Sequence, residues 1–268
     1  MNNNQILKTR SQIFNISSKN ALKYNNGSYK SDLIFQFPNW VKPENVHNAY
    51  FSISHAEIPN SFYLISASRA NNIFNILENS ITLSYTIPDG NYNVKTLISY
   101  LVSVLPVRFT ISYSDVTLKF TFSNTTYNFS VLSTSTIGSI MGFQDTITST
   151  AFTLTMPFVM NFIPIPRLNV RSNAFNFNSY GARGNTDLIL SLQNNALTNS
   201  MVLYTNQNNL RFPLNVANIQ TVDIRISDDN LNLINLNNCD FFISFVIETE
   251  YYELQLPKNI NDLLALQN

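Results

Sequence analysis

The sequence has few charged residues. They make up 12% of its 268 residues, about half the usual share. The 16 basic and 16 acidic side chains give a formal net charge of zero. Proteins that bind nucleic acid carry a basic excess or stripe, and long-range attraction to anionic membranes needs positive charge. We therefore expect neither specific nucleic acid nor a charged lipid surface as a partner.

Cysteine is almost absent, since Cys239 is the single one. An intrachain disulfide is therefore excluded, and with it a disulfide-stapled secreted fold. Cys239 lies beside Phe241 and Phe242 with no basic neighbour, which predicts a buried structural thiol rather than a nucleophile. The first ten residues lack the apolar core of a signal peptide, and no run approaches the roughly 18 apolar residues of a membrane span. We expect a protein that is made and folded in the cytosol.

Motifs for nucleotide, nucleophile and metal chemistry are missing as well. With six glycines in all, neither a phosphate-binding glycine loop nor a nucleophile elbow occurs. The stretch from Tyr180 to Gly184 has the only glycine pair near a basic residue, Arg183, and we interpret it as a loop. The two histidines, His47 and His55, do not have a metal-ligand spacing. The sequence predicts no cofactor and no metal site.

Carboxylates are sparse and lie mostly in turns or at strand edges. Asp228 and Asp229 are typical of a turn. Glu248, Glu250 and Glu253 border the last predicted strand, and the first two share one face. An acid/base pair needs two carboxylates that converge in different environments, whereas a solvated strand face is the simpler interpretation. We predict that the chain is not an enzyme; a glycosidase built on Glu248 or Glu250 is the enzymatic alternative.

Neutral polar and aromatic residues are abundant. Asn, Ser and Thr must supply the polar surface, and there are 13 Tyr and 20 Phe against one Trp, Trp40. A neutral surface is easily covered by other protein because few charges need to be desolvated, although an AT-rich coding sequence would also favour Asn, Ile, Phe and Tyr. Most aromatics are expected in the core, and the others can build protein interfaces or glycan platforms.

Strand patterns dominate after a polar start. Residues 1–30 are predicted to be an N-terminal arm with little core. Its basic residues could contact a neighbouring subunit or packaged nucleic acid, although a solvated terminus is the simpler interpretation. From Asp32 onward, short runs with alternating apolar residues recur at roughly 8–12 residue spacing, which is typical of a β-sandwich or barrel. The predicted strands cover residues 33–37, 48–58, 73–77, 81–87, 108–113, 116–122, 127–132, 188–192, 201–204, 222–226 and 241–251. Residues 152–170 are predicted to be extended and 171–186 a loop.

One segment has clear helical periodicity. In residues 93–105 the apolar positions follow the spacing of one helical face. Asn93 can serve as the N-cap and Pro106 marks the end. Residues 135–143 are predicted to be a short helix or turn. Residues 81–150 form a β-α-β unit that is inserted between two halves of a sandwich, and the tail 257–268 can end in a small helix.

Several segments in a fixed order resemble a known family. They are Ala56 to Tyr63 (AEIPNSFY), Tyr85 to Asn93 (YTIPDGNYN) before the helix, the strands at Thr110 and Lys119, and Ile140 to Phe143 (IMGF). This order resembles the penton (minor capsid) proteins of virophages, polinton-like viruses and related large DNA viruses. Residues 50–170 carry the resemblance best; the remainder matches only in its β character. The pattern is also similar to modules of other virion proteins.

The resemblance implies an all-β fold: a single jelly-roll β-sandwich, residues 31–80 and 151–256, with an inserted small β-rich domain containing one helix. It also implies a homopentamer at icosahedral vertices that contacts major capsid proteins of the double jelly-roll type, located in the virion and assembled in the host cytoplasm. No catalytic, cofactor-binding or metal residues follow from it. The alternative is a virion spike or attachment protein that binds a host glycan or receptor through exposed tyrosines such as Tyr180 or Tyr204.

Overall fold

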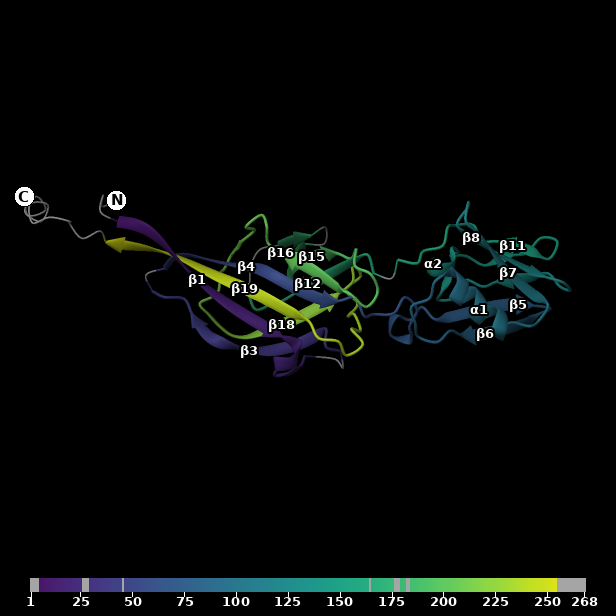
Figure 1. The fold of residues 1–268 in the computed structure, drawn as a ribbon, viewed down its shortest axis with the longest axis horizontal. Coiled ribbons are helices and arrows are strands. Elements are labelled where there is room, and N and C mark those ends of the chain that lie inside the picture. The colour runs from purple at the N-terminus through teal and green to yellow at the C-terminus, as the bar shows by residue number, and fades with distance from the viewer. Residues whose placement is uncertain are drawn as a thin grey trace, which may run out of the picture. The chain divides into compact units, whose positions relative to one another are not determined.

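The computed structural model describes residues 5–25, 29–44, 46–163, 165–175, 179–181 and 184–254. The chain splits into two compact units. Unit 1 consists of Met1–Ser61 and Arg167–Asn268, and unit 2 consists of Phe62–Pro166. Both are built mainly from β-strands (Figure 1), so the predicted all-β class is confirmed.

Unit 1 contains two layers of antiparallel sheet. Its strands are β1 (Gln5–Ser17), β2 (Lys23–Tyr24), β3 (Asp32–Val41), β4 (Val46–Pro59), β12 (Arg167–Arg171), β13 (Ser179–Gly181), β14 (Gly184–Thr186), β15 (Leu188–Gln193), β16 (Met201–Thr205), β17 (Phe212–Pro213), β18 (Asn218–Ser227) and β19 (Phe242–Leu254). A short 3-10 helix, η1 (Ser18–Asn20), follows β1.

Eight of these strands pair in a nested order. In chain order they are β1, β3, β4, β12, β15, β16, β18 and β19. The first pairs with the eighth, the second with the seventh, the third with the sixth and the fourth with the fifth, all antiparallel. Pairing of β19 with β4 and of β18 with β12 joins them into the sheets β1-β19-β4-β16 and β15-β12-β18-β3. This nesting is the jelly-roll topology, so the predicted single jelly roll is confirmed.

The core of unit 1 lies between the two sheets and is largely aromatic. Alternate residues of β3 are buried, among them Phe35 and Phe37, as expected for a strand with one covered face. From the other sheet Phe51 is fully buried and its ring stacks on that of Phe175, with centroids 4.4 Å apart and planes 5° from parallel. The ring of Phe245 lies on the other side of Phe175 at 5.2 Å.

The N-terminus differs from the predicted arm of residues 1–30. Residues 5–17 form β1, whose 13 residues each have a partner on β19; Figure 1 shows the two strands side by side. Among its described side chains only Ile16 is fully buried, and Phe14 packs against Phe37 at 4.4 Å. The ladder of backbone hydrogen bonds holds β1 in the sheet, and such a ladder leaves little trace in hydrophobic periodicity.

Unit 2 has two sheets and two helices. Its elements are η2 (Ala67–Arg69), β5 (Ile73–Glu78), β6 (Ile81–Thr86), α1 (Val94–Val104), β7 (Phe109–Ser114), β8 (Lys119–Asn124), β9 (Phe129–Val131), α2 (Gly138–Met141), β10 (Ile147–Thr148) and β11 (Thr153–Thr155). The sheet orders are β10-β9-β5-β6 and β11-β8-β7. Unit 2 occupies the connection between the third and fourth jelly-roll strands, β4 and β12.

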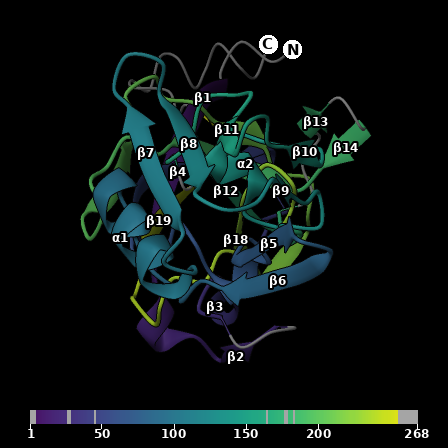
Figure 2. The same cartoon turned by 90° about the vertical axis from the view of Figure 1, so that its right-hand side faces the viewer.

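Helix α1 confirms the helix predicted from periodicity. The Asn93 side chain accepts from the backbone N–H of Thr96 at 3.0 Å, and the Thr96 hydroxyl accepts from the backbone N–H of Asn93 at 2.9 Å, which is a reciprocal capping box. The helix buries Leu97 and Leu101 and lies beside β7 (Figure 2). Unit 2 thus has an apolar core of its own, which includes Phe74, Phe120 and Phe122.

Some loop predictions differ from the structure. Residues 152–170 were expected to be extended, but among the described positions of this range only β11 and the first four residues of β12 are strands. The predicted loop 171–186 contains the hairpin of β13 and β14. Compact unit 2 spans 62–166, wider than the 81–150 expected for an insertion, because β5 pairs with β6 and β9 rather than with a jelly-roll strand. The tail 257–268 lies outside the described residues.

Candidate binding pocket and interaction surfaces

The carboxylates that sequence reasoning singled out are held by one guanidinium. Arg211 lies 3.2 Å from Glu248 and 3.5 Å from Glu250, and its guanidinium sits over the Tyr50 ring, 4.1 Å from the centroid. Asn48 donates to Glu250 at 3.0 Å. Both carboxylates therefore share the same cation, and Glu250 is the more buried of the two, with side-chain exposures of 11% for Glu250 and 30% for Glu248.

The remaining acidic candidates organise the backbone or pair on the surface. Glu253 pairs with Lys8, whose pKa is raised by its hydrogen bond to Glu253 and by that residue's charge. Asp228 accepts from the backbone N–H groups of Asn230 and Asn232 at 2.8 and 2.9 Å, which is the turn role expected of it. Asp89 likewise accepts from a backbone N–H, that of Ala67, at 2.8 Å.

The two histidines stand apart on the same strand, β4. Eight residues of extended chain separate them, about 26 Å, which is too far for one metal ion. The His47 ring lies 5.3 Å from that of Tyr252, and His55 Nε2 lies 2.9 Å from Glu57. Across the described ranges, no three His, Cys, Asp or Glu side chains group in a way that could hold a metal.

The positions of Cys239, Tyr180 and Tyr204 in the structure agree only in part with those predicted from the sequence. Cys239 is a free, half-buried thiol in the turn before β19, not the fully buried one that was predicted; its backbone N–H donates to the carbonyl of Leu236, which fixes that turn. Tyr180 belongs to β13, and its side chain, like Arg183, lies outside the described residues. Tyr204 is a half-buried residue of strand β16 rather than a loop residue.

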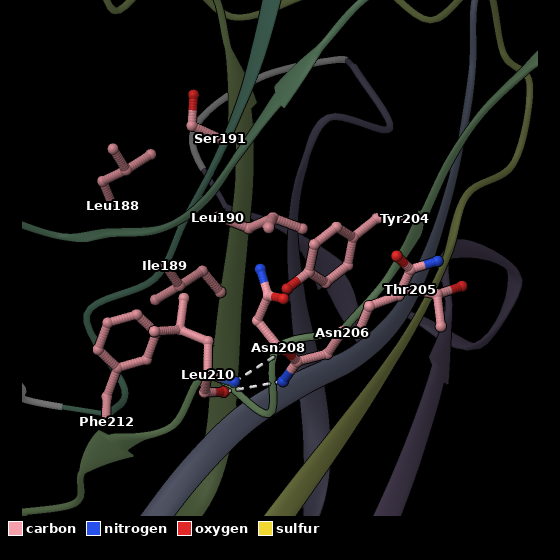
Figure 3. A pocket seen from close by; sticks show the side chains of 11 residues that line it. Leu188, Ile189, Leu190, Ser191, Tyr204, Thr205, Asn206, Asn208, Leu210 and Phe212 are labelled. Carbon is pink, nitrogen blue, oxygen red and sulfur yellow. Dashed lines mark hydrogen bonds between the residues drawn. The ribbon is translucent and has the colours of Figure 1, made fainter.

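Tyr204 lines a pocket of about 470 Å³. The pocket lies where β15 and β16, the terminal strands of the two jelly-roll sheets, meet the loop 206–210 (Figure 3). None of the eleven lining residues is charged. Leu190 and Phe212 supply apolar surface, while Tyr204 and Asn208 supply polar groups. This volume falls in the range of small-molecule sites.

Hydrogen bonds fix the loop that closes the pocket. The Asn206 side chain donates to the carbonyl of Leu210 at 2.8 Å and accepts from the N–H of Leu210 at 2.9 Å, as the dashed lines in Figure 3 show. The backbone N–H of Asn206 donates to the carbonyl of Ser54 in β4 at 3.0 Å. Asn206 therefore positions the loop, because both its amide nitrogen and its amide oxygen are hydrogen-bonded to Leu210.

A second notable surface is the free side of β1. This strand is terminal in its sheet and pairs only with β19 among the described residues. Ile6, Leu7 and Ile13 are exposed along it, Ile13 to 67%. A long edge strand with exposed apolar side chains is a template for pairing with another chain unless something covers it.

Unit 2 has a charge network that sequence reasoning missed. Glu78 at the end of β5 is buried and accepts from the Arg108 guanidinium through both oxygens and from the Asn124 side chain. These hydrogen bonds and the Arg108 charge hold the pKa of Glu78 below its ordinary value. The sequence signal was only a lone acidic and a lone basic residue in a weakly charged region, 30 positions apart.

The network supports one end of unit 2. The Asn124 side-chain oxygen Oδ1 accepts from the backbone N–H groups of Thr126 and Tyr127 at 2.8 and 3.1 Å, and the Asn124 backbone N–H donates to the carbonyl of Phe152. Phe152 and its neighbour Ala151 have positive φ values of 64° and 49°, which side chains other than Gly and Asn rarely adopt. The loops at this end are therefore held in a fixed conformation.

No family model matches the sequence, and no curated protein matches it either. Among solved structures, the fold is similar to the crystal structure of the selenomethionine-labelled penton protein of mavirus. The TM-score is 0.48 at 11% sequence identity, and the match covers 90% of this chain and 99% of that chain.

Within the described part of the chain, neither helix is long and apolar enough to cross a membrane.

Proposed function

We propose that the chain is a structural virion protein: the subunit of a penton, a minor capsid homopentamer that closes the icosahedral vertices. In this role it contacts its own copies and a major capsid protein of the double jelly-roll type, resides in the virion and assembles in the host cytoplasm. It performs no catalysis. The jelly-roll topology, together with the motif order between residues 50 and 170, supports this proposal, since capsid proteins are among the main users of that fold.

The observation that carries the proposal is the edge strand β1, which pairs only with β19 in the part of the chain that the structure describes. Thirteen residues of strand with exposed Ile6, Leu7 and Ile13 are a liability for a protein that stays alone,. A ring of copies covers such an edge by a heterologous contact, in which one patch meets a different patch of the next copy. The residues that were expected to be an arm touching neighbouring subunits thus supply the proposed contact as a strand.

The low charge of the chain is consistent with this contact. Only 12% of the residues are charged, and several charged side chains are already paired within unit 1, as Arg211 is with Glu248 and Glu250. Covering such a surface requires little desolvation of unpaired charge, which is the main cost of burying charged groups in an interface.

The experiment is the molar mass of the purified full chain in solution, measured by light scattering after size exclusion over a range of protein concentrations. Five copies of the 30.5-kDa chain give about 150 kDa,. Ile13→Lys places a charge on the β1 edge and is expected to shift the mass toward the monomer. Val116→Lys, at a site in unit 2 that is 92% exposed, is the matched control and is expected to leave the mass unchanged. A strict monomer at every concentration would contradict the pentamer.

A second candidate function is that of a virion attachment protein that binds a host glycan or receptor. The specific observation in its favour is the uncharged pocket beside Tyr204. A trimer in the same light-scattering experiment would favour this candidate over the vertex role.

A further inference from the structure

The pocket at β15 and β16 has the lining of a site for a small polar but uncharged ligand. None of its eleven described lining residues is Lys, Arg, Asp or Glu, whereas sites for phosphate, sulfate or carboxylate groups use Arg or Lys to form charge-assisted hydrogen bonds. An acidic saccharide, a nucleotide or an anionic lipid headgroup would leave its charge unpaired in this pocket. The lining therefore selects for a neutral ligand.

The lining also argues against a purely apolar ligand. Tyr204, Asn208 and Ser191 bring a phenol, an amide and a hydroxyl to a space whose other walls include Leu190 and Leu210. An aliphatic ligand would remove water from these polar groups without replacing their hydrogen bonds, which costs free energy. A saccharide presents both an apolar C–H face and several hydroxyls, and so matches both kinds of wall.

Two polar groups remain available for such a ligand. In Figure 3 the Tyr204 ring and the Asn208 side chain point toward one another, with Leu190 and Leu210 close by. No described residue forms a hydrogen bond with the Tyr204 hydroxyl or with the Asn208 amide. Burial raises the pKa of Tyr204, so its phenol remains a neutral donor over the physiological pH range. Asn206 is committed to Leu210 and only positions the loop.

We propose that this pocket binds a neutral saccharide, with Tyr204 as the aromatic wall, Asn208 as the hydrogen-bonding amide, and Asn206 as the residue that positions the loop. The proposal rests on the attachment role named above as the second candidate and specifies its ligand class. It does not depend on the pentamer.

The test uses the full chain on an array of neutral glycans, terminating in hexoses and N-acetylhexosamines, beside acidic glycans that carry sialic acid or sulfate. We expect binding to a subset of the neutral glycans only. The affinity for the best of them is then measured by calorimetry for the unmodified chain and for variants, and thermal unfolding of each variant confirms that it folds.

Asn208→Ala is expected to weaken binding about five- to tenfold, as the loss of one hydrogen bond predicts, and Tyr204→Phe by a similar factor. Asn206→Ala is expected to weaken binding through the loop, and Asn206→Asp, which keeps the acceptor for the Leu210 N–H, to retain more of it. Tyr24→Ala, at an exposed tyrosine of β2, is the matched control and is expected to bind normally.

Absence of binding to every neutral glycan, binding to acidic glycans alone, or unchanged affinity in both Tyr204→Phe and Asn208→Ala would overturn the proposal. Light scattering of the same samples tests the pentamer proposal separately from the saccharide proposal. A pentamer that binds no glycan refutes only the saccharide site. If neither the unmodified chain nor the pocket variants bind a glycan, but the variants form an oligomer of lower molar mass, the pocket is a contact between copies and not a ligand site.

Discussion

Replacing Glu78 by Gln should destabilise unit 2 and leave unit 1 unchanged. The Glu78 side chain is only 3% exposed and accepts from both Arg108 and Asn124. Breaking a buried ion pair by removing one partner costs about 3–5 kcal/mol. Because the Arg108 side chain is 35% exposed and can regain water, we expect the lower end of that range, about 3 kcal/mol. For a unit of this size, that corresponds to a fall in melting temperature of roughly 10–20 °C.

The single tryptophan separates the two units in this assay. Trp40 lies in β3 of unit 1, so tryptophan fluorescence reports the unfolding of unit 1 alone, whereas calorimetry detects both units. Glu78→Gln should lower the midpoint temperature of one calorimetric transition, that of unit 2, which tryptophan fluorescence does not detect. Asp145→Asn removes the same charge from an exposed position of unit 2. This variant should change neither the calorimetric nor the fluorescence melting temperature. Equal melting temperatures for Glu78→Gln and the unmodified chain would refute the assigned role of the network.

The same residue predicts the direction of a pH dependence. The folded-state pKa of Glu78 is lower than its ordinary value of 4.5, chiefly because of the hydrogen bond from Arg108. A carboxylate with a lowered pKa contributes stability above its unfolded-state pKa, and that contribution is lost as the pH falls through the lower folded value. Unit 2 of the unmodified chain should therefore lose stability below about pH 4.5, and Glu78→Gln should flatten this part of the profile.

Three further predictions concern the fold. Deleting residues 5–17 should prevent unit 1 from folding, because β19 loses one of its two partner strands along its whole length and keeps only β4; a soluble product with native Trp40 fluorescence would show that β1 is dispensable. Residues 62–166 expressed alone should unfold cooperatively around their own core, and a non-cooperative melt would contradict this. Gly142→Ala should cost about 2–3 kcal/mol, because Gly142 has φ +88° and a Cβ would overlap the carbonyl oxygen of Phe158; Gly90→Ala, facing only the movable Tyr92 ring, should cost less in the same denaturant titration.

Local signals in the sequence were sufficient where burial and capping act over a few residues. Asn93 and the apolar face behind it placed α1 almost to the residue, and alternation placed β3 and β6. Helix α1 and strand β3 were predictable because each buries one face in a regular repeat,. In β6 the same alternation leaves Leu83 and Tyr85 half-buried on one face.

Elements held by distant partners could not be found in this way. Strand β1 buries little and depends on β19 more than 220 positions away. Glu78 and Arg108 meet only because the turn after β5 and the start of β7 come together. The pocket beside Tyr204 exists because β15 and β16 end two different sheets. Tyr204 was singled out as an aromatic residue, but nothing local indicated Asn206 or Asn208.

The most direct test of the capsomer proposal is the rotational symmetry of the assembled protein, seen in electron-microscopy class averages of the purified full chain in the form with the highest molar mass. The account predicts rings with five-fold symmetry that disappear in Ile13→Lys and persist in Val116→Lys. Three-fold particles would contradict the predicted pentamer. Five-fold rings that are unaffected by Ile13→Lys would contradict the assignment of the β1 edge as the contact between copies.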